Sequence, residues 1–363
     1  MSRKRRYRKK KKERFSLKRA LGRFLVFLFA TALLCSSISI FINPKFSWIP
    51  MFLGLYFVPV FIANIVIFLI LLAKRQALLV VPLIAILPSL IYSDRFVKFG
   101  SDEPQVSGRN VTILSYNLGR FAAAGKDVTR AEATAMIEKY ISEKNPDIVC
   151  LQEYLCSDPA MVEEFLPQYP FRDYHLFKGK GYFGNLTLSR YPIQSGEEIM
   201  FDKSTNLCLV SDIDLGSQTV RMFNCHLESY ALTFTSIIKR LSNRSQFTDE
   251  FMQLHGRLRD ATVKRAGQVA AVIRSDLSSA YPSIICGDFN DTPVSYAYHQ
   301  LQKSKKDSFV ESGKGFSSTY SVFWPLLRID YILFPERYEC ADHRVERVSY
   351  SDHYPIMTKI YYE

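Results

Sequence analysis

The sequence predicts an α/β sandwich of two packed β-sheets, preceded by transmembrane helices. Residues 21–92 are mostly apolar and contain no Asp or Glu, which indicates helices inside a membrane. From residue 108 onward, short β-rich runs alternate with helical segments and turns, the pattern of a mixed α/β domain. The chain of 363 residues is longer than one ordinary domain, so it has room for both parts.

The positive charge of the chain is concentrated outside the predicted sandwich. The net charge is +12, but residues 1–19 alone hold twelve Lys or Arg and one acid, and residues 20–92 add four more positive charges. Residues 93–363 are therefore slightly acidic. A nucleic-acid binder usually carries its excess positive charge on the domain that docks. Nucleic acid is possible as a partner but not favoured, although the basic tail itself could bind anionic lipid or nucleic acid.

Three runs in the apolar region lack any charged residue. Each is long enough, or nearly so, to cross a hydrocarbon core of ~30 Å as a helix, and proline is tolerated there. A cleaved signal peptide is the competing reading of the first run, but its basic region would be unusually long and no small-x-small site follows. The three runs are Phe24–Ile42, Trp48–Ala73 and Gln76–Tyr92.

The charges also predict an orientation. The basic tail should stay in the cytoplasm, and three crossings would then place the sandwich outside, on the periplasmic side. If the third run instead lies flat on the membrane, the sandwich is cytoplasmic. We expect a multi-pass protein of the cell membrane with an extracytoplasmic domain. The expected divisions are a basic cytoplasmic tail at 1–20, a membrane region at 21–92, a linker at 93–107 and a catalytic domain at 108–363.

Polar side chains of one chemical kind gather where the predicted strands end. They are carboxylates, amides and imidazoles, with no Ser or Cys in a setting suited to a nucleophile. Oxygen ligands suit magnesium, manganese or calcium better than zinc. A hard cation beside a water-activating carboxylate and histidines is a set for hydrolytic phosphoryl transfer. The candidate residues are Asn117, Glu153, His226, Asp288, Asn290, Asp330, Asp352 and His353.

Each candidate has an ordinary alternative reading. Glu153 could be a solvated charge at a strand end, and Asp288 and Asn290 could form a turn through local hydrogen bonds. His353 could be a satisfied core residue. The functional reading gains its weight from the occurrence of all the motifs in one chain. His175, His255, His299 and His343 fall outside the motifs, and we expect them at the surface.

Seven segments together resemble the endonuclease/exonuclease/phosphatase superfamily, in which they occur in the same order. This superfamily includes deoxyribonuclease I, apurinic-site endonucleases, neutral sphingomyelinases and inositol polyphosphate 5-phosphatases. The resemblance covers residues 108–363 and implies a four-layer, deoxyribonuclease I-like sandwich and a metal-dependent phosphoesterase. The segments are ILSYN, DIVCLQE, GNLTLSRYPI, FNCHLES, IICGDFND, RIDYIL and SDHYPI.

The resemblance implies a metal site. Glu153 matches the principal ligand of Mg²⁺, with Mn²⁺ as a possible replacement. Asn117 and Asp352 match positions in the surrounding network of metal and water. One position departs from the apurinic-site endonucleases, which have an Asp two residues after the first-motif Asn where this chain has Gly119. That departure weakens the apurinic-endonuclease reading and leaves the metal site intact.

The resemblance also implies catalytic roles. Asp288 matches the residue that activates or orients the attacking water, and Asn290 matches the residue that steadies it. His226 and His353 would contact the phosphate, and Asp330 would orient the imidazole of His353. Family members differ in which residue is the general base. The CHLES context of His226 resembles the deoxyribonuclease and sphingomyelinase branches.

These observations favour a membrane-anchored hydrolase of a lipid or small phosphoester. An extracytoplasmic nuclease and a catalytically silent binding protein are the alternatives. A broad positive groove would indicate the nuclease, and a narrow apolar-rimmed pocket a lipid or small substrate. We expect a helix at Asp260–Leu277 and an irregular insertion at Ser229–Arg259, where lipid-headgroup contact and a solvated loop both remain open. The sequence sets no oligomeric state.

Overall fold

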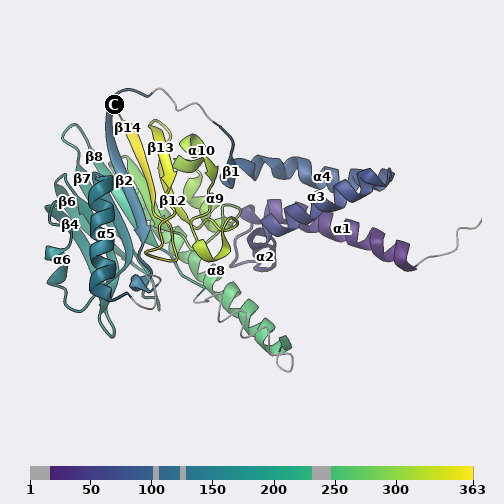
Figure 1. Ribbon diagram of the computed structural model, residues 1–363, viewed down its shortest axis with the longest axis horizontal. Coiled ribbons are helices and arrows are strands. Elements are labelled where there is room, and N and C mark those ends of the chain that lie inside the picture. The colour runs from purple at the N-terminus through teal and green to yellow at the C-terminus, as the bar shows by residue number, and fades with distance from the viewer. Residues whose placement is uncertain (1–16, 101–105, 123–127, 231–246, 363) are drawn as a thin grey trace, which may run out of the picture.

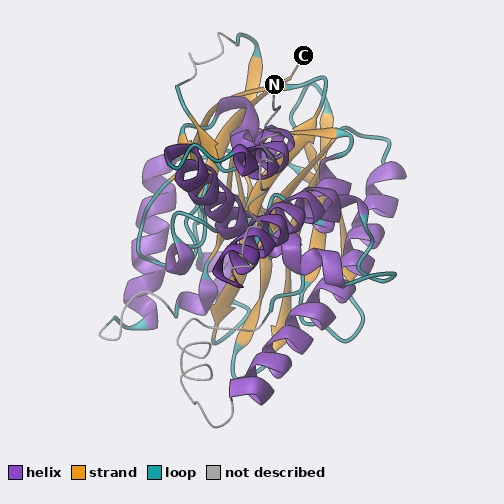
Figure 2. Cartoon of the chain, turned by 90° about the vertical axis from the view of Figure 1, so that its right-hand side faces the viewer, coloured by secondary structure: helices purple, strands orange, loops and turns teal. Residues whose placement is uncertain are grey.

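Two six-stranded sheets face each other and carry helices on their outer faces, in the computed structural model (Figure 1). The structure describes residues 17–100, 106–122, 128–230 and 247–362. This is the predicted α/β sandwich, with apolar helices preceding it. α1, α3 and α4 extend away from one side of the sandwich, and Figure 2, viewed from that side, shows strands behind the helices.

The first sheet is antiparallel except for one central pair, β2 and β3, which run parallel. Asn117, the last residue of β2, pairs with Gln152 of β3 and therefore lies beside Glu153, although β3 continues to Cys156. In spatial order the sheet consists of β13 (Glu339–Val345), β14 (Ile356–Tyr362), β2 (Arg109–Asn117), β3 (Ile148–Cys156), β5 (Tyr182–Ser189) and β4 (Phe171–Lys178).

The second sheet repeats this plan with β8 and β9 as its parallel pair. Asn117, His226 and Asp288 each end a strand of these two pairs, and Glu153 lies within β3 at the same edge, which explains why the four can meet. In spatial order the sheet consists of β10 (Lys305–Asp307), β12 (Asp330–Pro335), β9 (Ser283–Asp288), β8 (Thr219–His226), β7 (Leu207–Asp214) and β6 (Ile193–Met200). The shorter elements are β1 (Val97–Lys98), α6 (Met161–Glu164), α10 (Ser308–Ser312) and β11 (Gly315–Phe316).

Apolar side chains fill the space between the sheets and beneath the outer helices. β-branched residues such as Ile113, Ile284 and Ile356 form the central layer and are almost completely buried. Outside the first sheet lies α5 (Arg130–Lys144), which begins at the predicted capping box of Thr129 and Glu132. Outside the second sheet lie α8 (Phe247–Leu277) and α9 (Tyr296–Gln302).

Helix α8 corrects one prediction. It begins at Phe247 rather than at Asp260, so residues 247–259 are helical instead of irregular. Only the later part of α8 packs on the second sheet, through residues such as Val269 and Val272. The earlier part projects beyond the sheet (Figure 1), and its apolar residues Phe251, Leu254 and Leu258 recur at helical spacing but line a cavity instead of the sheet. Residues 231–246 of the predicted insertion lie outside the described residues.

Within the described residues, two continuous apolar helical stretches are long enough to cross a membrane, Leu17–Phe41 and Ala77–Arg95. They contain α1 (Leu17–Ile38) and α4 (Val80–Ser89). The middle predicted run consists of two helices, α2 (Ile49–Leu55) and α3 (Phe57–Ala73), bent by 68°. Taken together they also pass the test of length and apolar composition, as a broken span or a re-entrant loop. Pro59 accounts for the break, since its ring lacks an N–H and would clash with the carbonyl of Leu55 in a continuous helix.

Hydrogen bonds from a few polar side chains tie the apolar helices together. Asn64 of α3 is buried, and its Nδ2 donates to the carbonyl oxygen of Phe29 in α1 at 2.9 Å. The Ser36 hydroxyl donates to the carbonyl oxygen of Leu53 at 2.7 Å. Such bonds tie apolar helices together and give their buried polar side chains partners. We refer to α1–α4 as the helical bundle.

The helical bundle docks directly on the sandwich. Arg95 donates from Nη1 to the carbonyl oxygen of Pro293 at 2.8 Å, and its guanidinium lies 5.0 Å from the centre of the Tyr298 ring. Asn43 donates from Nδ2 to the hydroxyl of Tyr296 at 3.1 Å. Part of the predicted linker is therefore structured, because β1 also pairs with β11.

Gly287 provides a test of how closely the two parallel strands of the second sheet pack. Its φ is +123°, and a Cβ there would collide with the carbonyl oxygen of Cys225. Gly287→Ala should therefore lower the free energy of unfolding by more than about 3 kcal/mol. Gly216 also has a positive φ but open space around it, so Gly216→Ala should cost only about 1 kcal/mol. Thermal unfolding of the full chain in detergent measures both, and equal losses would contradict the packing argument.

Candidate active site

The carboxylate of Asp288 lies at the centre of the polar cluster. Asp288 ends β9 and is only 1% exposed. Its Oδ2 accepts a hydrogen bond of 2.8 Å from Nδ2 of Asn117, which ends β2 in the opposite sheet. Asn290 donates from its backbone N–H to Oδ1 at 2.8 Å and from Nδ2 to Oδ2 at 3.0 Å. Donors from both sheets thus fix the orientation of this carboxylate.

A β-bulge presents Glu153 to the same cluster. The register of β3 against β5 shifts between Leu151 and Tyr154, and Glu153 has a φ of +50°. A bulge redirects a side chain, and a left-handed conformation outside glycine costs of order 1–3 kcal/mol. Arg120 forms an ion pair from Nε to Glu153 Oε2 at 3.0 Å, and its guanidinium lies over the Phe183 ring. The strain at Glu153 is located at the site itself.

His353 and Asp330 form a buried pair beside Asp288. Nδ1 of His353 lies 3.0 Å and 3.2 Å from the two carboxylate oxygens of Asp330. The other ring nitrogen, Nε2, lies 3.9 Å from Asp288 Oδ2. Ser351, in the same loop, donates its hydroxyl proton to the carbonyl oxygen of Asn117 at 2.8 Å. Asp330 therefore sets the direction in which the imidazole points.

His226 approaches the cluster from the end of β8. Its Nε2 lies 3.6 Å from Glu153 Oε1 and 3.8 Å from Asp288 Oδ2. This nitrogen is buried, and no hydrogen-bond partner reaches it among the described residues. Buried polar atoms are almost always paired, so an unpaired one between two carboxylates indicates a place for a ligand.

Burial and neighbouring charges change the pKa values of these groups in different directions. Burial raises the pKa of Asp288 to about 7, and the charge of His353 opposes that rise. Burial alone would lower the pKa of His353, but the carboxylates of Asp330 and Asp288 outweigh it and raise that pKa to about 10. Burial lowers the pKa of His226, with Glu153 acting in the opposite direction. The two histidines are thus electrostatically different.

Two groups of side chains could hold a metal ion. The first group is Asp288, Asp330 and His353, each of which offers one ligand atom, and these three atoms lie within 4.8 Å of one another. The second group, Glu153, Asn117 and Asp352, offers the oxygen donors that Mg²⁺ prefers. A Cβ at Gly119 would lie 2.8 Å from Asp352 Oδ1, so glycine leaves this carboxylate room. The unpaired nitrogen of His226 and these oxygen donors fit a metal ion with a phosphate ligand.

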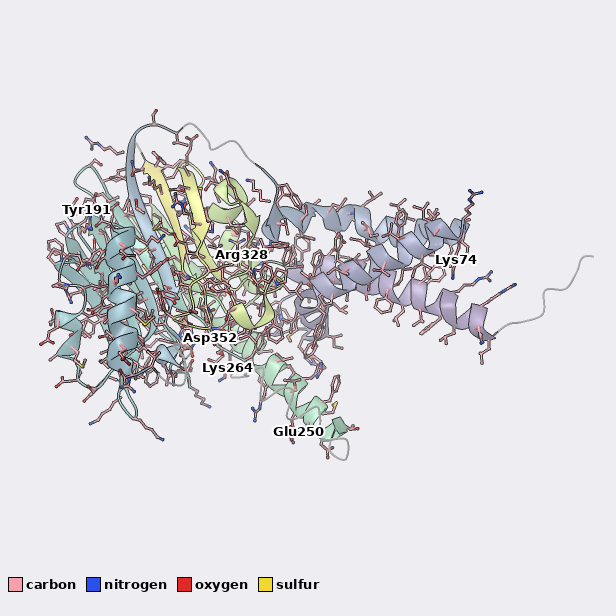
Figure 3. All side chains as sticks on the ribbon, viewed as in Figure 1. Lys74, Tyr191, Glu250, Lys264, Arg328 and Asp352 are labelled. Carbon is pink, nitrogen blue, oxygen red and sulfur yellow. The ribbon has the colours of Figure 1, made fainter. Side chains whose placement is uncertain are left out.

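A cavity of about 620 Å³ opens above the polar cluster. Glu153, Asp288, Asn290, Asp352 and His353 line its polar end. Its remaining walls are largely apolar and come from three places. Figure 3 shows Asp352 toward the side of the sandwich from which the bundle extends, and Lys74 at the remote end of the bundle. The apolar contributors include Leu55, Phe57, Val58 and Phe96 of the bundle and its junction, Leu254 and Leu258 of α8, and Phe323, Leu326 and Leu327 of the loop before β12.

The structure thus brings all eight predicted site residues to one place. It also reveals residues that were not among the eight candidates. Gln152 donates from Nε2 to Asn224 Oδ1 at 2.7 Å in a buried amide network between the sheets. The sequence signal for this network was the presence of polar residues within apolar runs. Arg120 had no such signal. Two histidines expected at the surface lie elsewhere, since His255 lines the cavity and His343 is buried, with Nδ1 2.8 Å from the Ser308 hydroxyl.

Residues 114–353 match the Endonuclease/Exonuclease/phosphatase family, so the chain belongs to this family and is a phosphoesterase. The resemblance of the motifs is thereby confirmed. Members of the family are typically metal-dependent, in keeping with the buried Asp/Asp/His group. Residues 18–96, which include the helical bundle, match a domain family of unknown function, DUF8431. No curated protein sequence matches the chain.

Solved structures share the fold at low sequence identity. An endonuclease/exonuclease/phosphatase from Beutenbergia cavernae is 17% identical, with a TM-score of 0.53, covering 70% of this chain and 72% of that one. TDP2 of D. rerio, complexed with a single-strand DNA product, is 19% identical, with a TM-score of 0.49 and coverage of 70% and 99%. A mannosyl-6-phosphatase of Bacteroides thetaiotaomicron is 16% identical, with a TM-score of 0.48 and coverage of 69% and 100%. The first likeness shows the fold alone.

Gly119 allows a test of the space around Asp352. Gly119→Asp would place a Cβ 2.8 Å from Asp352 Oδ1 at a φ of +54°, with a second carboxylate beyond it. We expect hydrolysis of a soluble phosphodiester to fall by about 10–100-fold, because a small misplacement of a reacting group has that effect. Gly216→Asp, in open space, is the control and should retain activity. Full activity of Gly119→Asp would show that Asp352 does not need this room.

Proposed function

We propose that the protein is a membrane-anchored, magnesium-dependent hydrolase that cleaves a lipid or small phosphoester by metal-assisted attack of water. One observation carries the choice of substrate. Five residues of the polar cluster line a cavity whose remaining lining is largely apolar and partly belongs to the helical bundle. A substrate with a phosphoester at one end and apolar groups at the other matches that distribution.

Glu153, Asn117 and Asp352 would hold the metal. The alternative group is less suited, because both carboxylate oxygens of Asp330 already face Nδ1 of His353. Mg²⁺, with Mn²⁺ as a substitute, would polarise the phosphoryl oxygen and offset its developing negative charge. The ion pair with Arg120 marks the Glu153 carboxylate as a position where positive charge is favourable.

Asp288 would direct the attacking water. Three hydrogen bonds from Asn117 and Asn290 hold its carboxylate in one orientation, so a water molecule bound to it would also be oriented. Its raised pKa makes it a better proton acceptor than an ordinary Asp. His226 and His353 approach from either side and would meet the phosphate.

Charge and shape both favour a lipid or small substrate over nucleic acid. The lining of the cavity includes no Lys or Arg among the described residues. Binding to a nucleic-acid backbone relies on such residues. The part of the cavity lined by described residues therefore lacks the positive charge that a nuclease groove would need. The silent binding protein is also disfavoured, since every motif residue is present and the eight lie together.

The bundle would anchor the protein with its catalytic domain outside the cytoplasm. Support comes from the arrangement of its helices. α1 begins, and α3 ends near Lys74, at the end of the bundle remote from the sandwich (Figures 1 and 3). The basic tail and Lys74 would thus share the cytoplasmic side, and the sandwich would lie on the other.

The proposed roles predict how the full chain responds to substitution. In detergent with Mg²⁺, Glu153→Gln and Asp288→Asn should each lower kcat/KM for bis(p-nitrophenyl) phosphate and for phospholipids by about 10²–10⁴-fold. Chelation of Mg²⁺ should have a similar effect on the unsubstituted protein. Activity that survives chelation, or either substitution, would contradict the proposal.

Matched surface substitutions serve as controls. Glu197→Gln and Asp202→Asn change the same chemical groups at exposed positions outside the cavity lining. Both should leave kcat/KM unchanged. The absence of any Mg²⁺- or Mn²⁺-dependent turnover by the folded, unsubstituted chain would favour the silent binding protein.

A further inference from the structure

The break between α2 and α3 lines the same cavity as the polar cluster. Cavity-lining residues run through this break without interruption, from Gly54 to Pro59. The helices meet at 68°, so the break forms a corner rather than a straight helical face. Tyr56, at the corner, is exposed, whereas its neighbour Phe57 is buried. A segment predicted only to cross a membrane is therefore also part of the active-site cavity.

Close packing holds this corner against the catalytic loop. Gly54 lies so near Val294 that a Cβ would collide with the Val294 carbonyl oxygen. Val294 is fully buried and belongs to the same apolar cluster as Leu33 and Ala85 of the bundle. It follows Asn290 by only four residues. The loop that carries Asn290 is thus also the segment against which the bundle packs.

The corner also lies at the end of the bundle nearest the sandwich. The helices beyond it have exposed apolar side chains, including Ile62, Val66 and Leu69 of α3, as expected for contact with lipid. A cavity at this level would sit near the boundary between lipid headgroups and acyl chains. A membrane-embedded substrate could then present its phosphoester to the polar end without leaving the bilayer.

We propose that the apolar part of the cavity binds the hydrocarbon chain of a lipid phosphoester. This inference rests on the proposed function and names its substrate class. The chain would lie against Leu55 and Val58 at the corner, Leu254 of α8 and Leu326 of the loop, with the phosphoester at Asp288. About 620 Å³ falls within the ~300–1,000 Å³ typical of sites for small ligands. The driving force is removal of the chain and these walls from water.

Two substitutions fill the proposed chain site from opposite walls. Val58→Trp narrows the corner, and Leu326→Trp narrows the loop side. Each has a matched control outside the cavity lining, on the same segment. Val66→Trp lies on α3, where Val66 is 49% exposed, and Val322→Trp lies in the same loop, where Val322 is 39% exposed.

The measurement is a ratio of kcat/KM values for the full chain in nanodiscs with Mg²⁺. Long-chain phosphatidic acid, phosphatidylglycerol and polyprenyl phosphate are compared with bis(p-nitrophenyl) phosphate, which has no chain. For the preferred lipid, both cavity variants should lower the lipid-to-soluble ratio by at least about tenfold, since small misfits in apolar pockets have effects of that size. The controls should leave the ratio within about twofold. The lipid with the highest kcat/KM distinguishes glycerolipid from polyprenyl sources.

If the lipid-to-soluble ratio of kcat/KM is unchanged in both cavity variants, the cavity does not bind the hydrocarbon chain. This holds even if the lipid and soluble activities both fall. The proposed function fails separately, if the unsubstituted chain hydrolyses none of these substrates. A readout independent of activity then decides the inference. A phosphatidic acid analogue with a diazirine in its acyl chain should label peptides of the α2–α3 corner in the unsubstituted protein, and less so in Val58→Trp. Labelling that misses the corner would also overturn the proposal.

Discussion

The site depends on a carboxylate buried between two β-sheets. Without hydrogen-bond donors, burying Asp288 would be costly, and Asn117 and Asn290 supply donors from both sides. The bond from Asn117 crosses from one sheet to the other, so the carboxylate is held in place only when the sheets are packed in register. The parallel pairs β2–β3 and β8–β9 place the strand ends where this is possible. The strained Glu153 and the Asp330–His353 pair are then arranged around a fixed centre.

The same centre is connected to the helical bundle. The segment after Asn290 packs against the bundle at Val294, and the α2–α3 corner lines the same cavity as Asp288. Bundle and sandwich therefore share the active site instead of being joined by a free tether. This arrangement gives a physical reason for the union of an apolar helical region with a phosphoesterase domain in one chain.

The sequence predicted the sandwich and the eight site residues, because strand-end motifs combine a buried run with an abrupt polar residue. It could not predict which surfaces the bundle covers. Apolar composition identifies the run Trp48–Ala73 but does not reveal that its Pro59 breaks it beside the catalytic loop. The start of α8 was missed because its first apolar residues, Phe251, Leu254 and Leu258, face the cavity and not the sheet that the later part of the helix covers. Arg120 was missed because its partner Glu153 is distant in the sequence.

We infer that Glu153 is a ligand of the metal and that Asp288 orients the attacking water. Binding of Mn²⁺ to the full chain, followed by electron paramagnetic resonance without substrate, tests this division of roles apart from activity. With these roles, Glu153→Gln should abolish tight Mn²⁺ binding and Asp288→Asn should retain it. The opposite result, with Mn²⁺ binding lost in Asp288→Asn and kept in Glu153→Gln, would contradict the role of Glu153 as metal ligand. It would assign the metal to the group of Asp288, Asp330 and His353.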